Sequence, residues 1–136
     1  MTTPISGPIT GLITGPITGP ASIDAVRTVD RSGLPIVPDP ADYDQVSEGW
    51  SETEFRAVQL AEDSLGGLWE GTPGTVFFES WPYTEFCVMI SGRVAVVDTE
   101  GGRREFGAGQ AFVVPRGFRG TWETMEPSVK YFVAMR

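Results

Sequence analysis

Apolar and polar residues alternate in a series of short segments from Glu54 to the end of the chain. Alternation with a period of two is typical of a strand that has one buried face, because successive side chains point to opposite sides of a sheet. The pattern predicts nine strands, at residues 54–60, 66–71, 75–81, 86–90, 93–98, 103–106, 111–114, 120–125 and 129–135.

Glycine and proline separate these segments. The chain has 17 Gly and 11 Pro, and most of the breaks between strands contain one or both. No long stretch has the periodicity of an amphipathic helix. Many short strands joined by Gly and Pro turns favour an antiparallel sandwich or barrel. We therefore predict an all-β domain at residues 54–136.

The first 53 residues have a different character. Residues 1–22 are of low complexity, with Ile-Thr-Gly recurring at Ile9, Ile13 and Ile17, and we expect a disordered or loosely extended arm. The alternative is an arm that adds a strand to a neighbouring subunit. Residues 23–53 are acidic and interrupted by proline, and we expect an irregular lead-in wrapped on the outside of the domain. Within it, Asp39 and Pro40 predict the capped start of a short helical turn.

The composition excludes several classes of function. A net charge of −8 argues against nucleic acid and anionic membranes, and no apolar run reaches the ~20 residues of a membrane span. The chain has no histidine and one cysteine, Cys87. Histidine-dependent catalysis and tight transition-metal sites are thereby improbable, and the absence of an internal disulfide fits a reducing cytoplasm.

Two motifs stand out among the predicted strands. Glu85 is followed after six residues by Gly92, and Gly109 is followed by a Pro-x-Gly that ends at Gly117. This pair resembles the two halves of the cupin motif. The stretches at 69–74, 85–92, 106–112, 115–123 and 130–133 are similar to the small single-domain cupins named after the ureidoglycine aminohydrolase cupin domain, which include ethanolamine-utilisation-type cupins.

The resemblance implies a jelly-roll barrel, a homodimer and a site in the barrel mouth. In metal-binding cupins two His and a Glu come from the first motif and one His from the second. Here Glu85 occupies the Glu position, and Gly120 stands at the second-motif His position. The two remaining His positions fall on Phe78 and Ser80, or on Glu79 and Trp81. Because three of four ligands are absent, we expect no metal and no other cofactor.

Strand alternation identifies a candidate pocket. If Glu85 points inward, Cys87 and Met89 share its face, and Gly120, Trp122 and Thr124 share the inner face of their own strand. Gly120 in place of a histidine is expected to leave room beside Trp122. Other aromatic residues expected to complete a small-molecule pocket are Trp69, Trp81, Tyr83 and Phe112.

Glu85 has two interpretations. As a catalytic acid or base it needs burial to raise its pKa toward neutrality. As a structural residue it accepts hydrogen bonds from the backbone or from an arginine such as Arg93 or Arg119. Glu79 is a possible second carboxylate, although an outward, solvated side chain is the simpler expectation for it.

Two further residues belong to the candidate site. Cys87 lies in an apolar run, so it is expected to be a small buried side chain, and without a neighbouring base its thiolate is poorly populated. Arg119, next to the Pro-x-Gly turn, is a candidate for binding a substrate carboxylate, the alternative being a solvated surface arginine.

The sequence thus predicts a metal-independent cupin that binds a small organic molecule. If it is an enzyme, general acid or base chemistry at Glu85 suits isomerisation, epimerisation, cyclisation or elimination. The alternative is a non-catalytic ligand-binding or scaffold cupin with a structural Glu85. A metal-dependent, aminohydrolase-like enzyme is the weakest alternative, because the histidines are missing.

Overall fold

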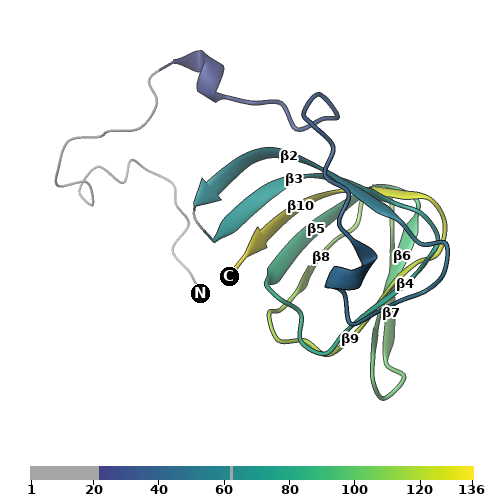
Figure 1. Ribbon diagram of the computed structural model, residues 1–136. Coiled ribbons are helices and arrows are strands. Elements are labelled where there is room, and N and C mark those ends of the chain that lie inside the picture. The colour runs from purple at the N-terminus through teal and green to yellow at the C-terminus, as the bar shows by residue number, and fades with distance from the viewer. Residues whose placement is uncertain (1–21, 62) are drawn as a thin grey trace.

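The computed structural model describes residues 22–61 and 63–136. Ten strands follow one another along the chain, and short 3-10 turns at Ile23–Ala25 and Pro40–Asp42 precede them. Figure 1 shows how the labelled strands are arranged in space. Their bounds are β1 Gln45–Val46, β2 Glu52–Ala61, β3 Ser64–Gly71, β4 Gly74–Phe78, β5 Thr84–Ser91, β6 Arg93–Asp98, β7 Arg103–Gly107, β8 Ala111–Val114, β9 Gly120–Thr124 and β10 Ser128–Met135.

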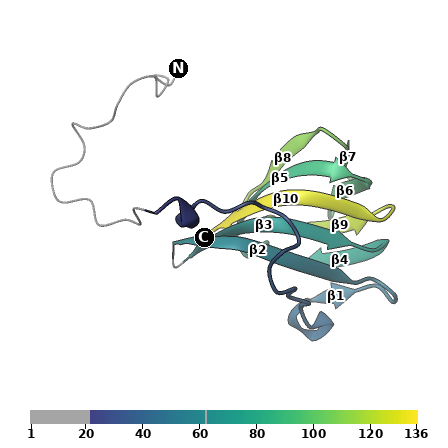
Figure 2. The same cartoon turned by 90° about the horizontal axis from the view of Figure 1, so that it is seen from above.

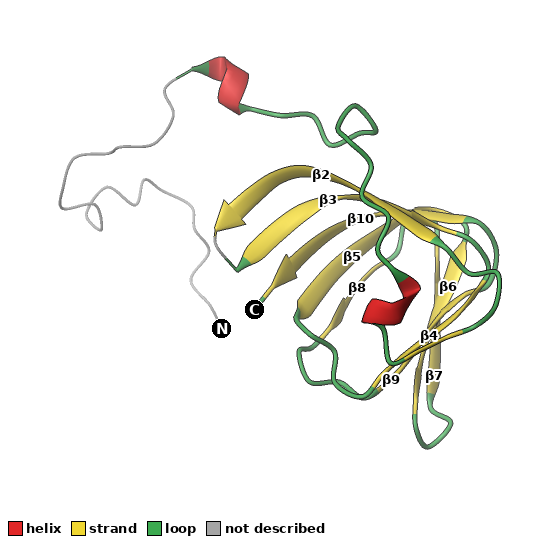
Figure 3. Cartoon of the chain, in the orientation of Figure 1, coloured by secondary structure: helices red, strands yellow, loops and turns green. Residues whose placement is uncertain are grey.

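These strands form two antiparallel sheets that face each other. Sheet A has the order β2-β3-β10-β5-β8, and sheet B has the order β1-β4-β9-β6-β7. Figure 3 shows that strands dominate the described chain, which confirms the predicted all-β jelly roll. No hydrogen-bonded ladder between described strands joins the two sheets, so the barrel is not closed. Within the described residues no helix has the length and apolarity to span a membrane.

All nine predicted strands are present, and two of them end earlier than expected. The segment predicted at 120–125 ends one residue early, at Thr124. The segment predicted at 75–81 ends as β4 at Phe78. Beyond it, Trp81 leaves the ladder and pairs with the loop before β9, since its N–H donates to Phe118 O at 2.8 Å and its carbonyl accepts from Gly117 N at 2.8 Å. Trp81 is therefore buried from a loop, and its place does not follow from strand alternation.

The lead-in is partly ordered by the sheets. As predicted, the Asp39 side chain caps the turn that begins at Pro40 and accepts a bond from Ala41 N at 2.9 Å. Figure 2 shows the lead-in crossing the outer side of sheet A, as expected. Its last part then turns inward, and Trp50 is only 7% exposed. The lead-in was expected on the outside of the domain, but its last part contributes Trp50 to the core. The predicted arm, residues 1–22, lies outside the described residues except for Ser22.

The outer faces of the two sheets differ in chemistry. On sheet B, Arg93, Arg103, Glu105 and Glu123 form a network of ion pairs with N···O distances of 2.6–3.1 Å. On sheet A, large apolar side chains are exposed on adjacent strands, and a shallow groove between them is lined almost entirely by apolar atoms. The exposed residues are Phe86, Ile90, Val113, Tyr131 and Met135.

The motif glycines are explained by backbone conformation. Gly92, Gly109 and Gly117 all have positive φ, at 82°, 84° and 89°, in the turns that follow β5, β7 and β8. An L-residue in this region is strained by roughly 1–2 kcal/mol. Gly92 carries a second constraint, because a Cβ there would collide with the carbonyl oxygen of Pro127 and with Ser128, whereas Gly109 and Gly117 face open space.

Gly92→Ala is therefore expected to destabilise the fold by about 3 kcal/mol or more, since it adds a steric clash to the conformational strain. Gly109→Ala and Gly117→Ala are the matched controls and should each cost only about 1–2 kcal/mol. Urea denaturation of the three variants measures these differences. Equal losses at all three positions would contradict the explanation.

Candidate functional site

A buried ion pair lies between the two sheets. Lys130 on β10 and Glu85 on β5 have side chains that are 4% and 8% exposed, and Lys130 Nζ donates to Glu85 Oε2 at 2.6 Å. The other oxygen of Glu85 accepts from the indole of Trp81 at 3.3 Å. Isolated charges are costly to bury, so the pair depends on this mutual compensation.

Aromatic rings surround the ammonium group. Lys130 Nζ lies 3.9 Å from the ring centroid of Trp122 on β9 and 4.7 Å from that of Trp69 on β3. The negative face of an indole attracts a cation, and the attraction is larger when water is excluded. Trp69 is the register partner of Lys130, whereas Trp122 approaches from sheet B, so the cation is held between both sheets.

Cys87 is the third neighbour of the ammonium, with its Sγ 3.6 Å from Lys130 Nζ. Burial raises the pKa of the Cys87 thiol to about 12, although the adjacent Lys130 lowers it. Burial alone would lower the pKa of Lys130, yet Cys87 and Glu85 raise it overall. Because the thiol keeps its proton at neutral pH, the anion that stabilises the ammonium is Glu85.

Two further carboxyl groups enter the site from β2. Glu54 accepts from the Arg56 guanidinium, with Oε2 3.0 Å from both Nε and a terminal nitrogen. Glu52 has no such cation. Its Oε1 accepts from Trp69 Nε1 at 2.7 Å, and its Oε2 has no hydrogen-bond partner among the described residues. Burial raises the pKa of Glu52 to about 7, and the neighbouring Glu54 adds to the rise, while Trp69 and Lys130 oppose it.

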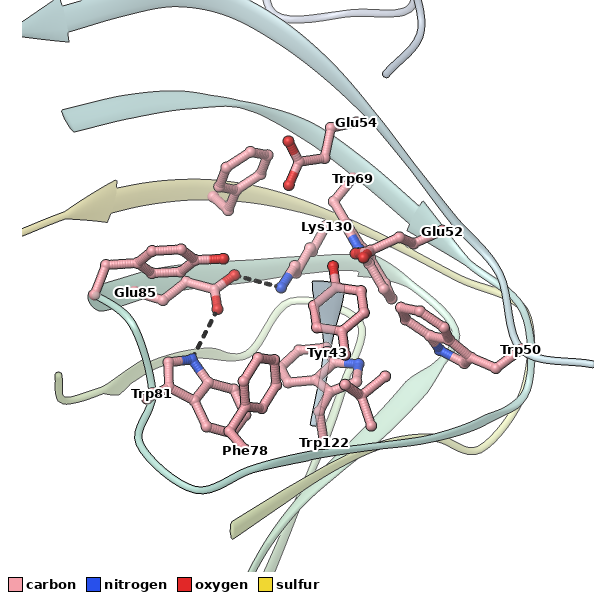
Figure 4. Close-up of a pocket in the computed structure, with 13 residues that line it drawn as sticks. Tyr43, Trp50, Glu52, Glu54, Trp69, Phe78, Trp81, Glu85, Trp122 and Lys130 are labelled. Atoms are coloured by element: carbon pink, nitrogen blue, oxygen red, sulfur yellow. Dashed lines mark hydrogen bonds and ion pairs between the residues drawn. The ribbon is translucent and has the colours of Figure 1, made fainter. Parts of the chain in front are cut away.

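The remaining wall of the cavity comes from the lead-in and β4. The ring of Tyr43 packs edge-on against Trp50 and Phe78, with centroids 5.7 and 5.6 Å apart. Figure 4 shows these rings closing the side opposite β2 and β10. The indole Nε1 of Trp50 is buried and has no acceptor among the described residues. The open space inside is about 30 Å³, room for one or two water molecules.

The structure brings together most of the residues that the sequence analysis selected. Glu85, Trp69, Trp81, Tyr83 and Trp122 all line the cavity. The inward direction of Cys87 and Met89, with exposures of 0% and 1%, and of Gly120, Trp122 and Thr124 agrees with strand alternation. Burial, and the nearby Glu85, raise the pKa of the Tyr83 phenol well above its usual value. Cys87 touches the ion pair without lining the cavity.

Three selected residues lie elsewhere. Phe112 is stacked between Phe106 and Trp122 behind the cavity wall. Glu79 and Arg119 pair with each other on the surface, at 2.8 Å between Nε and Oε2 and with side chains 61% and 55% exposed. The partner suggested for Glu85, Arg93 or Arg119, is also wrong, because Lys130 occupies that role.

The expected room at Gly120 is absent as well. A Cβ there would collide with the carbonyl oxygen of Val97 and lie 2.6 Å from the ring of Phe118. A histidine therefore cannot be accommodated without a shift of β6. Glu85 is already bonded to an ammonium, and Ser80 is exposed. The residues present do not fit the ligand set of metal-binding cupins, and no group of three His, Cys, Asp or Glu suited to a metal occurs within residues 22–61 and 63–136.

Sequence reasoning missed Lys130, Glu52, Trp50 and Tyr43. Lys130 had a detectable signal, since it shares strand parity with Phe132 and Ala134 and so points inward. Glu52 likewise shares parity with the buried Glu54. The sequence carries no such signal for Tyr43 and Trp50. They lie in irregular chain, and long-range contacts set its path over the sheets.

Comparison with known proteins identifies the family. The sequence profile described as the EutQ-like cupin domain matches residues 59–132. A structure of EutQ from Clostridium difficile aligns with a TM-score of 0.58 at 18% identity, covering 84% of this chain and 96% of that one. A putative ethanolamine utilization protein Q from Salmonella typhimurium aligns with a TM-score of 0.58 at 16% identity, covering 79% and 97%.

A larger protein shares the fold too. A Pseudomonas syringae protein of unknown function aligns with a TM-score of 0.65 at 21% identity over 79% of this chain, but this chain spans only 46% of its length. None of the curated proteins matches the chain significantly. At these identities the solved structures support the fold alone.

Lys130→Met is expected to destabilise the protein by about 3–5 kcal/mol, because it leaves the Glu85 carboxylate buried without a counter-charge. The double variant Lys130→Met/Glu85→Gln should recover much of this loss, which makes the two effects non-additive. Arg119→Met, which breaks the exposed pair with Glu79, is the control and should cost less than about 1 kcal/mol. Chemical denaturation of these three variants and of Glu85→Gln alone completes the double-mutant cycle. Additive effects of the two cavity substitutions would refute the coupling.

Glu52→Gln is expected to remove a pH dependence of stability. In the folded protein the pKa of Glu52 is about 7, against an ordinary value of 4.5. Between pH 4.5 and pH 7 the folded state therefore binds more protons than the unfolded state. Wild-type stability should therefore fall as pH rises from 4.5 to 7, by up to about 3 kcal/mol. The stability of Glu52→Gln relative to wild type should rise over the same interval. Glu79→Gln, an exposed control, should leave the profile unchanged in unfolding experiments from pH 4.5 to pH 8.

Proposed function

The chain belongs to the EutQ-like cupin domain family, and on that premise we propose that it binds a small organic molecule between its sheets without a metal. The proposal rests on two residues that line an aromatic cavity, Glu52 and Trp50. The Oε2 atom of Glu52 and the indole N–H of Trp50 are buried and lack partners among the described residues. Buried polar groups are nearly always hydrogen-bonded, so a group without a protein partner needs water or a ligand.

Lys130 gives this cavity a fixed positive charge. An ammonium has three N–H donors, and one of them here bonds to Glu85. Cys87 Sγ and the ring face of Trp122 lie next to the same nitrogen. A metal ion in a catalytic site keeps an open coordination position, which this ammonium does not offer. In our proposal Lys130 therefore holds Glu85 in place by electrostatic attraction, and it does not bind an exchangeable ligand as a metal ion would.

Glu52 is the group suited to proton transfer. A catalytic acid or base works best with a pKa near the working pH, and burial brings the pKa of Glu52 to about 7. Glu85, the residue selected from the sequence, is held by Lys130 and Trp81 at both oxygens. In our proposal, isomerisation, epimerisation, cyclisation or elimination would use Glu52, while Glu85 and Lys130 organise the cavity.

A non-catalytic scaffold is the second candidate function. It is favoured by the open space of about 30 Å³, which excludes a ligand larger than a few atoms unless Tyr43 and Trp50 move.

The homodimer and the cytoplasmic location stay predictions. The apolar outer face of sheet A is where a second copy would bury the most apolar area.

The indole N–H groups give a direct test of ligand binding. The chain has four tryptophans. Trp69, Trp81 and Trp122 donate to Glu52, Glu85 and Thr124, and Trp50 alone among them has no acceptor. A panel of metabolites with up to about six heavy atoms, added to chelator-treated protein, should include one that shifts the Trp50 indole signal in a ¹⁵N–¹H spectrum.

The Trp50→Phe variant identifies that signal, and the indole signal of Trp122, already bonded to Thr124, is the internal control. If no member of the panel moves any indole signal at millimolar concentration, the protein is a scaffold and the binding proposal fails. Binding that depends on added metal would contradict its metal independence.

A further inference from the structure

The open side of the sandwich carries a second and larger cleft. β7 and β8 are edge strands of sheets B and A, and no ladder between the described strands joins them. Figure 2 shows both at the end of the sandwich opposite β1 and β2. The cleft between them has an open space of about 470 Å³, within the range of about 300–1,000 Å³ that is usual for small-molecule sites. None of the described residues lines both this cleft and the cavity around Lys130.

Aromatic rings line the cleft and separate it from that cavity. Phe106 on β7 and Phe112 on β8 stack face to face, with centroids 3.9 Å apart and planes at 9°. On their far side the rings meet the cavity wall, since Phe112 packs on Trp122 and Phe118 on Trp81, at centroid distances of 6.0 and 5.8 Å. Phe106 and Phe118 are only partly buried. The cleft therefore offers accessible ring surface to a ligand from solvent.

Arg104 gives this apolar cleft a positive charge. It is the register partner of Val96 on β6, and both residues line the cleft. The preceding residue, Arg103, also borders the cleft, but its guanidinium pairs with Glu105 and Glu123 on the outer face of sheet B. Successive side chains of a strand point to opposite faces, so this outer network does not extend to Arg104. Within residues 22–61 and 63–136 no carboxylate forms an ion pair with Arg104.

The carboxylate that borders the cleft is committed elsewhere. Asp98 closes the turn between β6 and β7, where its Oδ1 accepts from the backbone N–H groups of Glu100 and Gly102, both at 2.8 Å. Water ordinarily satisfies an exposed arginine such as Arg116, which does not line the cleft. Arg104 differs from it because phenylalanine rings lie in the same cleft, and a ligand there can bury apolar area while it pairs with the cation.

We propose that the cleft between β7 and β8 is a second binding site, which takes a small aromatic carboxylate. The carboxylate pairs with Arg104, whose planar guanidinium matches two carboxylate oxygens. The ring of the ligand packs against Phe106 and Phe118. A cationic ligand would be repelled by Arg104, and a neutral one would gain no ion pair. This site is independent of the function proposed for the cavity around Lys130.

The test compares three probes that share a phenyl ring and differ in charge. Benzoate is the anion, benzyl alcohol is neutral and benzylamine is a cation. Each is titrated to tens of millimolar into protein with labelled methyl groups, because Val96 and Val113 line the cleft and report on it. Benzoate should shift these methyl signals and bind at least about tenfold more tightly than the other two probes. The indole signal of Trp50 should not move with benzoate, since Trp50 lines the other cavity.

Substitutions of arginine separate a specific pair from general electrostatics. Arg104→Gln should weaken benzoate binding about tenfold, and Arg104→Lys, which keeps the charge without the planar fork, should lie in between. Arg116→Gln is the matched control, because it removes the same charge from an exposed residue outside the cleft, and should leave the affinity unchanged. Raising the salt concentration from about 50 mM to about 500 mM should weaken binding to the wild type.

Three results would overturn the proposal. Equal binding of benzoate and benzyl alcohol would show an apolar cleft without the preference for a carboxylate. Equal losses in Arg104→Gln and Arg116→Gln would show attraction by overall charge and not by a site. Methyl signals of Val96 and Val113 that stay still with every probe, or that respond to protein concentration instead, would show a cleft that is closed or covered by another copy. None of these results bears on the Trp50 indole experiment, so the two proposals fail separately.

Discussion

The ammonium of Lys130, enclosed between two sheets of apolar and aromatic side chains, sets the conditions for everything around it. A charge in such a place is stable only if a counter-ion and polarisable neighbours replace the lost water. Glu85 supplies the counter-ion at 2.6 Å, and Trp122 and Trp69 supply the ring faces. These partners come from β5, β9 and β3, so the charge of one side chain ties three other strands from both sheets to β10.

This arrangement also defines what the site can do. In cupins that bind a metal, the cation is exchangeable and its ligands are side chains of the two motifs. Here the cation is covalently part of the chain, and Gly120, at a ligand position, is packed under the Phe118 ring. The polar groups left for chemistry lie on the opposite side of the cavity, at Glu52 and Trp50. In the proposed function, the fold is retained while the carboxyl group assigned to proton transfer lies on β2 and not on β5.

Local pattern was enough to predict nine of the ten strands but only part of the site. Alternation placed Glu85, Cys87 and Trp122 inside correctly, because a period of two is a property of each strand alone. The same rule applied to β10 places Lys130 inside, but lysine is seldom buried and Lys130 was not selected as a site residue. Trp81 and Trp50 reach the core from loops. Their positions depend on contacts such as the bonds of Trp81 to Gly117 and Phe118, which no local pattern encodes.

One wall of the cavity is built from chain that precedes the part matched by the cupin family. Tyr43 and Trp50 belong to the lead-in, and Glu52 is the first residue of β2, all of them before the part of the chain that matches the cupin family at residue 59. Residues in the central strands are constrained by two neighbouring ladders, whereas the lead-in is bound by a two-residue strand and a single bridge. Substitutions and insertions in such a segment can therefore reshape one wall of the cavity while the paired strands stay intact.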